Sequence, residues 1–300
     1  GKTFLINMVR KLAKQQNIDI AVTAMTGTAA YLLNGTTLHS WSGVGLGRDN
    51  VKQLIDKINK SNKARQRWRS ARILVIDEIS MMLPDLLDKL EIIARNFSNP
   101  HLPFGGIQVI LIGDFLQLPP IPDNGNEVNF AFQAGCWSSL ITETVILDEI
   151  IRQQDPVFRS CLRDIRVGNV TPETESILTS RINAKVTNAD IVATRIYPYK
   201  YSVENINSNN LVKLKSPLHK FKLSYTLSKN GVNIPVDCDN YQIRNILKNV
   251  SCDEKLSICV GAQVMLISNL DQEMGLVNGS RGVVYSITDK VPQVKFLNGV

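Results

Sequence analysis

The feature that most constrains the fold of this chain is an apolar run that ends in two adjacent carboxylates. The run RILVI, at 72–76, is almost entirely apolar, which is typical of a strand buried on both faces of a sheet. Asp77 and Glu78 follow it directly. In α/β folds the residues after such a strand lie at the carboxyl edge of the sheet, where ligands bind. The alternative is an ordinary strand end whose acids are solvated.

Further runs along the chain indicate an α/β fold with a parallel sheet. IQVILIG at 107–113 and DIAVTA at 19–24 are strand-like, whereas residues 4–16 have apolar residues at helical spacing. The length of 300 residues suits two domains, and we expect the first to span 1–145.

We expect the second domain to span 146–288, with TVIL at 144–147 opening its first strand unit. DIVATR at 190–195 reads as a further strand, and a helix is expected near 203–214. A polar, Asn- and Lys-rich insertion covers about 198–255. Residues 51–69 read as one basic helix, which is more often a solvated face than a nucleic-acid contact.

Two short motifs accompany the carboxylates and predict a nucleotide site for ATP and Mg²⁺. Gly1, Lys2 and Thr3 match the end of the phosphate loop GxxxxGK[ST], although this tripeptide alone is weak evidence. In that loop glycine lets the backbone approach phosphate, lysine reaches the outer phosphates and the hydroxyl ligates magnesium.

The carboxylates and a glutamine complete the predicted chemistry. Asp77 would hold Mg²⁺, and Glu78 would deprotonate the attacking water. Gln117 lies in GDFLQLPPI, at 113–121, after the second buried strand, and its amide can contact the terminal phosphate or the water. A strand followed by a Pro-rich turn would explain that segment alone, but not its position after Asp77 and Glu78.

Composition adds weaker limits on partners and compartment. The formal net charge of +7 fits either a basic soluble protein or one that binds a polyanion. The five cysteines form no CxxC pair and the three histidines are scattered, so we expect reduced thiols in an intracellular setting and no zinc site. No run of about 18 apolar residues occurs, so we expect no membrane span.

The order of the motifs resembles the PIF (petite integration frequency) family of DNA helicases, relatives of RecD in helicase superfamily 1. The resemblance rests on GKT, TGTAA, TTLHSW, DEISMM, GDFLQLPP, IIRQ and LVNGSRG, and it spans the chain apart from 198–255. It implies two RecA-like P-loop domains with ATP bound between them. Both would be incomplete here, with the strand before GKT and the last family segments absent, and residues 289–300 would begin a small β-barrel insertion. A fragment of this kind is expected to be nearly inactive alone.

The resemblance also implies a role for Arg152, in IIRQ, which would come from the second domain and contact the terminal phosphate. A solvated or salt-bridged arginine is the alternative. Two positions depart from the family pattern: Ile151 stands where an aromatic often precedes the arginine, and Trp41 stands where the family more often has Phe.

The segments TGTAA and TTLHSW supply the predicted DNA contacts. Thr26, Gly27 and Thr37 could bind phosphate oxygens through backbone N–H and hydroxyl groups. His39 and Trp41 could contact or stack on a base, since stacking tolerates any sequence. Core packing of Trp41 and a structural role for His39 are serious alternatives.

The second domain contributes Asn278 and Gly279, which by resemblance lie at its DNA edge. An Asn-Gly pair is also the strongest local signal for a hairpin turn, and both interpretations can hold together.

The family implies a 5′-to-3′ ATP-dependent helicase that acts on single-stranded, forked or structured DNA, as a monomer. Such enzymes act in replication, repair, recombination or telomere maintenance. The compartment would be the nucleus or mitochondrion, a viral replication site or the bacterial cytoplasm, according to the source. The alternatives are a RecD-like or other DNA-stimulated ATPase without processive unwinding, an AAA-type remodeller, and a decayed DNA-binding relic.

Overall fold

The computed structural model describes residues 1–121, 127–184, 194–223, 226–229, 232–235, 255–267, 270–271, 274–276, 279–289, 291–297 and 299. By its contacts the chain divides into two compact units, Gly1–Ile182 and Asn183–Val300, here called the N-terminal and C-terminal units. The boundary expected after residue 145 remains a prediction.

The N-terminal unit is built on a four-stranded parallel sheet with the strand order β2-β1-β3-β4. Its strands are β1 (Ile20–Ala24), β2 (Thr36–Thr37), β3 (Ile73–Asp77) and β4 (Gln108–Leu111). Ala24 at the end of β1 lies opposite Asp77 at the end of β3, so both strands end at the same edge. This sheet confirms the α/β class expected from the sequence.

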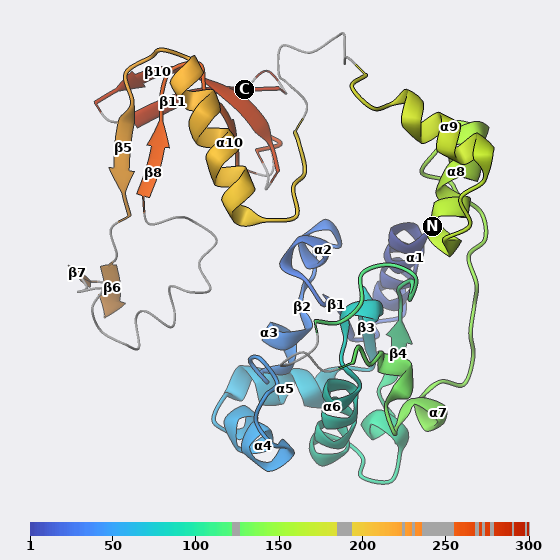
Figure 1. Ribbon diagram of the computed structural model, residues 1–300. Helices are drawn as coiled ribbons and strands as arrows, with labels where there is room; N and C mark the ends of the chain where they lie inside the picture. The colour runs from blue at the N-terminus through green and yellow to red at the C-terminus, as the bar shows by residue number, and fades with distance from the viewer. Residues whose placement is uncertain are drawn as a thin grey trace. The chain divides into compact units, whose positions relative to one another are not determined.

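Helices pack on both faces of this sheet (Figure 1). On one face Leu74 and Ile76 of β3 join a core with α4, α5 and α6, while Ile73 and Val75 pack on the other face with Ile6 of α1. Every residue of β3 is buried, as the apolar run predicted. The helices are α1 (Lys2–Gln15), α2 (Gly27–Leu32), α3 (Leu38–Ser42), α4 (Val51–Asn59), α5 (Asn62–Ser70), α6 (Pro84–Phe97), α7 (Trp137–Leu140), α8 (Pro156–Val167) and α9 (Pro172–Ser180).

Side-chain caps explain where several helices begin. Thr171 accepts a hydrogen bond from Thr174 N, with Pro172 in the first turn of α9. The expected single helix over 51–69 is wrong, because the chain forms α4 and α5 instead. Ser61 lies between them and accepts from Ala64 N, so it starts a new helix where one continuous helix was expected.

The C-terminal unit holds a helix, α10 (Lys200–Lys213), and antiparallel strand pairs. Its strands are β5 (His219–Lys222), β6 (Thr226–Lys229), β7 (Val232–Pro235), β8 (Lys255–Ile258), β9 (Gln263–Met265), β10 (Arg281–Thr288) and β11 (Val291–Phe296). β11 pairs with β10, and β10 with β9, so the strand expected to open a barrel at 289 continues a sheet that begins at Gln263.

Of two expected strands of a second parallel sheet, the first is not observed and the second lies largely outside the described residues. Residues 144–147 form no regular element, and Val145 and Ile146 are 75% and 82% exposed. Residues 190–193 of the other lie outside the described residues. The expected helix near 203–214 is confirmed as α10. In the described part of the chain no helix combines the length and apolarity that crossing a membrane requires.

Candidate functional site

The carboxyl edge of the sheet brings together the lysine and the two carboxylates singled out by the sequence. Lys2, in the first turn of α1, donates a hydrogen bond of 3.2 Å to Glu78 Oε1. Its Nζ atom also lies 3.9 Å from Asp77 Oδ1. We call these three residues the edge cluster, in which Lys2 meets two carboxylates although it lies 76 positions from Glu78.

The two carboxylates of the edge cluster have different environments. Asp77 is 5% exposed, and burial, partly offset by the backbone N–H of Glu78 and the charge of Lys2, raises its pKa. Glu78 is more accessible and has φ 56° and ψ 45°, a left-handed conformation that costs a non-glycine residue energy. Strain of this kind concentrates at functional positions.

The residues of the edge cluster fit a magnesium nucleotide. Asp77 Oδ1 is buried without a hydrogen-bond partner, so it has free lone pairs that a cation could use. The first turn of α1 contains no acidic residue, and Gly1 caps it without a side-chain bond, so its N–H groups are open to an anion. Thr3 is exposed in the same turn, where its hydroxyl could reach the same ion.

The GDFLQLPPI segment approaches the edge cluster closely through a glycine. Ile79, which follows Glu78, donates its N–H to Ile112 O over 3.0 Å. A Cβ on Gly113 would lie 2.7 Å from Ile79 Cγ2 and 3.0 Å from Ile79 N. Only glycine allows these two loops to approach so closely.

Replacing Gly113 with alanine is therefore expected to destabilise the protein by about 1–3 kcal/mol, the usual range for overpacking. The measurement is denaturant unfolding of the variant and of Gly27→Ala, since a Cβ at Gly27 meets nothing within 4 Å. The close approach would be contradicted if both variants unfolded at the wild-type denaturant concentration.

Gln117 is exposed and is held by an aspartate of its own motif. Its Nε2 donates to Asp114 Oδ2 over 3.2 Å. Asp114 in turn binds Arg166 of α8 through two bonds of 2.8 and 2.9 Å. Neither Asp114 nor Arg166 was predicted from the sequence, because no motif links residues 52 positions apart.

Arg152 is not brought to the edge cluster by any described contact. Its side chain is exposed and makes no hydrogen bond or ion pair with the residues that the structure describes. Its predicted role therefore stays a prediction.

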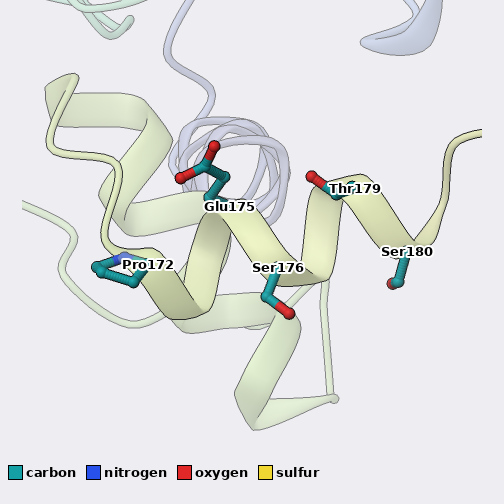
Figure 2. Close-up of a pocket in the computed structure, with 5 residues that line it drawn as sticks. All are labelled: Pro172, Glu175, Ser176, Thr179 and Ser180. Atoms are coloured by element: carbon teal, nitrogen blue, oxygen red, sulfur yellow. The ribbon is translucent and has the colours of Figure 1, made fainter.

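Two surface depressions lie apart from these residues. One is lined by residues of the segment 148–154 and of α8, and the other by five residues of α9 (Figure 2). Because the five side chains in Figure 2 come from one helix, that depression is a shallow helix face and not a cleft between elements. Neither contains Lys2, Asp77 or Glu78.

The predicted DNA-contacting threonines cap helices that start near this edge. Thr26 follows β1 by two residues and accepts from Ala29 N over 3.2 Å, while Thr37 accepts from Ser40 N over 3.3 Å. Gly27 is exposed in the first turn of α2. His39 is half-buried, and burial lowers its pKa, which favours the neutral ring at physiological pH.

Trp41 corrects the expectation of base stacking. Its side chain is only 7% exposed, and its ring centroid lies 4.8 Å from that of buried Trp68. Trp68 in turn donates its indole N–H to Ser42 O over 2.9 Å. The alternative of core packing therefore describes Trp41, since its ring has too little free surface to stack on a base.

β9 and β10 are antiparallel partners, as expected, but part of the expected Asn-Gly turn lies outside the described residues. Gly279 has φ 92° and donates its N–H to Leu266 O over 2.8 Å, a conformation that favours glycine. Gly279 is exposed, whereas Asn278 lies outside the described residues.

Comparisons with known proteins point to one helicase family. The profile of the family described as PIF1-like helicase matches residues 1–176. The profile described as the DNA helicase Pif1 2B domain matches residues 244–287. The chain is 38% identical over 287 residues to the ATP-dependent DNA helicase PIF1 of Emericella nidulans, covering 95% of this chain and 37% of that protein. It is 39% identical over 303 residues to the Xenopus laevis enzyme of the same name, covering 100% of this chain and 45% of that one. The chain thus spans less than half the length of these relatives.

Solved structures lead to the same family. The crystal structure of Pif1 helicase from Candida albicans aligns with a TM-score of 0.81 and 35% identity, covering 98% of this chain and 68% of that one. Bacteroides Pif1 in complex with ADP-AlF4 aligns with a TM-score of 0.68 and 27% identity, covering 98% and 66%. Other Bacteroides structures are described as bound to ssDNA, and one structure as two coordinating Pif1 helicases at forked dsDNA. On the family profile, the identities and the shared fold together, this chain belongs to the PIF1-like helicase family.

Proposed function

We propose that the protein is an ATP-dependent DNA helicase that moves 5′ to 3′ along single-stranded DNA. The observation that carries the proposal is the edge cluster, in which one lysine and two carboxylates meet at the carboxyl edge of a parallel sheet. Binding and hydrolysis of a nucleoside triphosphate need this combination of a phosphate-binding cation, a metal-binding carboxylate and a base. The description of Bacteroides Pif1 in complex with ADP-AlF4 supports nucleotide binding by this family member as well.

Each residue of the site has a proposed role. Gly1, Lys2 and Thr3 bind the phosphates at the start of α1, and Asp77 together with Thr3 holds Mg²⁺, which stabilises the charge that develops on the phosphates. Glu78 accepts the proton of the attacking water, and Gln117 orients that water. Arg152 contacts the terminal phosphate when the predicted domains, 1–145 and 146–288, close on the nucleotide.

The proposed DNA partner is a single strand, as described for Bacteroides Pif1, or a fork, as described for two coordinating Pif1 helicases. Thr26 and Thr37 lie at helix N-termini, where free N–H groups bind phosphate oxygens. Gly27, His39, Asn278 and Gly279 complete the proposed contacts. We propose that the protein acts as a monomer inside the cell, in replication, repair, recombination or telomere maintenance.

The test of direction is unwinding by the full-length protein of matched duplexes that carry either a 5′ or a 3′ single-stranded tail. We expect ATP-dependent strand separation of the 5′-tailed duplex and less than about a tenth of that rate on the 3′-tailed one. A preference for the 3′ tail would reverse the proposed direction. Hydrolysis stimulated by DNA without separation of either duplex would identify an ATPase that does not unwind processively.

A further inference from the structure

The Asp114 carboxylate, in the GDFLQLPPI segment, accepts four hydrogen bonds. Its Oδ1 accepts from Leu116 N over 3.1 Å and from Arg166 Nη2 over 2.9 Å. Its Oδ2 accepts from Gln117 Nε2 over 3.2 Å and from Arg166 Nε over 2.8 Å. The same carboxylate therefore binds the helix α8 and sets the position of the Gln117 amide.

The two hydrogen bonds from Arg166 fix the plane of the Asp114 carboxylate. A guanidinium that binds both oxygens through two parallel bonds fixes the orientation of a carboxylate, which a single point charge does not do. The pair holds the pKa of Asp114 down to about 2, so this side chain stays ionised at neutral pH. With Arg166 removed, the carboxylate could rotate about its side-chain bonds, and the acceptor of Gln117 would move with it.

We expect the Asp114–Arg166 pair to affect the position of the Gln117 amide more than the stability of the fold. The side chain of Arg166 is 50% exposed, and exposed ion pairs contribute little to the free energy of folding. An orienting amide, in contrast, is sensitive to small displacements, because misplacing a reacting group by about 1 Å can cost 100-fold in rate.

We infer that Arg166 is a positioning residue for ATP hydrolysis, which acts through Asp114 to hold the Gln117 amide where it can orient the attacking water. The inference rests on the proposed function and adds to it a residue outside the motifs. It also gives α8, the helix that follows the Arg152 segment, a mechanical connection to the loop that carries Gln117.

The test is a double-mutant cycle in the full-length protein, with kcat and KM for ATP measured at saturating single-stranded DNA. Arg166→Gln is expected to lower kcat by roughly 10-fold with KM changed less than 3-fold, because positioning and not binding is lost. Arg166→Lys keeps the positive charge but loses the planar guanidinium, so its kcat should fall between that of the wild type and that of Arg166→Gln. In the Gln117→Ala background, Arg166→Gln should have almost no further effect on kcat.

The matched control is Arg163→Gln, which removes an exposed arginine of the same helix that makes no ion pair with any described residue. It should leave kcat unchanged, and thermal unfolding should show Arg166→Gln within a few degrees of the wild type. If Arg166→Gln and Gln117→Ala lowered kcat independently, so that their effects multiplied, the inference would be overturned. A wild-type kcat for Gln117→Ala would overturn it too, whereas loss of hydrolysis in Glu78→Gln would still support the proposed function.

Discussion

Replacing Lys2 with alanine is expected to lower the rate of DNA-stimulated ATP hydrolysis by at least about 100-fold, the usual loss when one group that stabilises developing charge is removed. Lys2 is the cation of the edge cluster and lies in the first turn of α1, where the N–H groups are open. In the structure its Nζ binds Glu78, so the ammonium group is held at the sheet edge before any nucleotide arrives. The steady-state hydrolysis rate measures the loss of catalysis. The affinity for a fluorescent ATP analogue measures the loss of nucleotide binding separately.

The control for this variant is Lys11→Ala. Lys11 is exposed on the same helix and makes no ion pair among the described residues, so it matches the change in charge and in helix propensity. Equal rates for the Lys2 and Lys11 variants would show that α1 does not bind the phosphates through Lys2.

Replacing Glu78 with glutamine is expected to lower the hydrolysis rate by roughly 100- to 10,000-fold while ATP binding persists, because only the proton acceptor is lost. Glutamine keeps the size of the side chain and still allows a hydrogen bond to Lys2. The ion pair with Lys2 is partly exposed, and such pairs contribute about 0.2–1 kcal/mol, so ATP affinity should change by no more than a few-fold. Single-turnover hydrolysis and equilibrium binding separate the two effects.

Glu143→Gln serves as the control for this change. Glu143 is exposed and has no hydrogen bond or ion pair in the part of the chain that the structure describes. If Glu78→Gln hydrolysed ATP at the wild-type rate, Glu78 would not be the base that accepts the proton of the water. Its contact with Lys2 would then be its remaining assigned role.

Short, local sequence patterns predicted part of the fold and part of the site. The apolar run before Asp77 identified a strand buried on both faces. Parallel strands end at a common edge, so the order of the motifs also predicted that Lys2 would meet the carboxylates.

The features that could not be predicted depend on contacts between distant residues. Whether Trp41 stacks on a base or packs in the core depends on Trp68, 27 positions away, whose own indole N–H binds Ser42 O. The Asp114–Arg166 pair joins residues from two segments with no shared pattern. The break at Ser61 was a local signal, but the continuous basic character of 51–69 concealed it.

The measurement that tests the central claim most directly is ATP turnover by the full-length protein as a function of single-stranded DNA concentration. We expect turnover to rise by at least tenfold to a plateau with DNA, to require Mg²⁺ and to be lost in Glu78→Gln. Turnover that ignores DNA, or that survives in Glu78→Gln, would contradict a DNA-driven motor built on Lys2, Asp77 and Glu78.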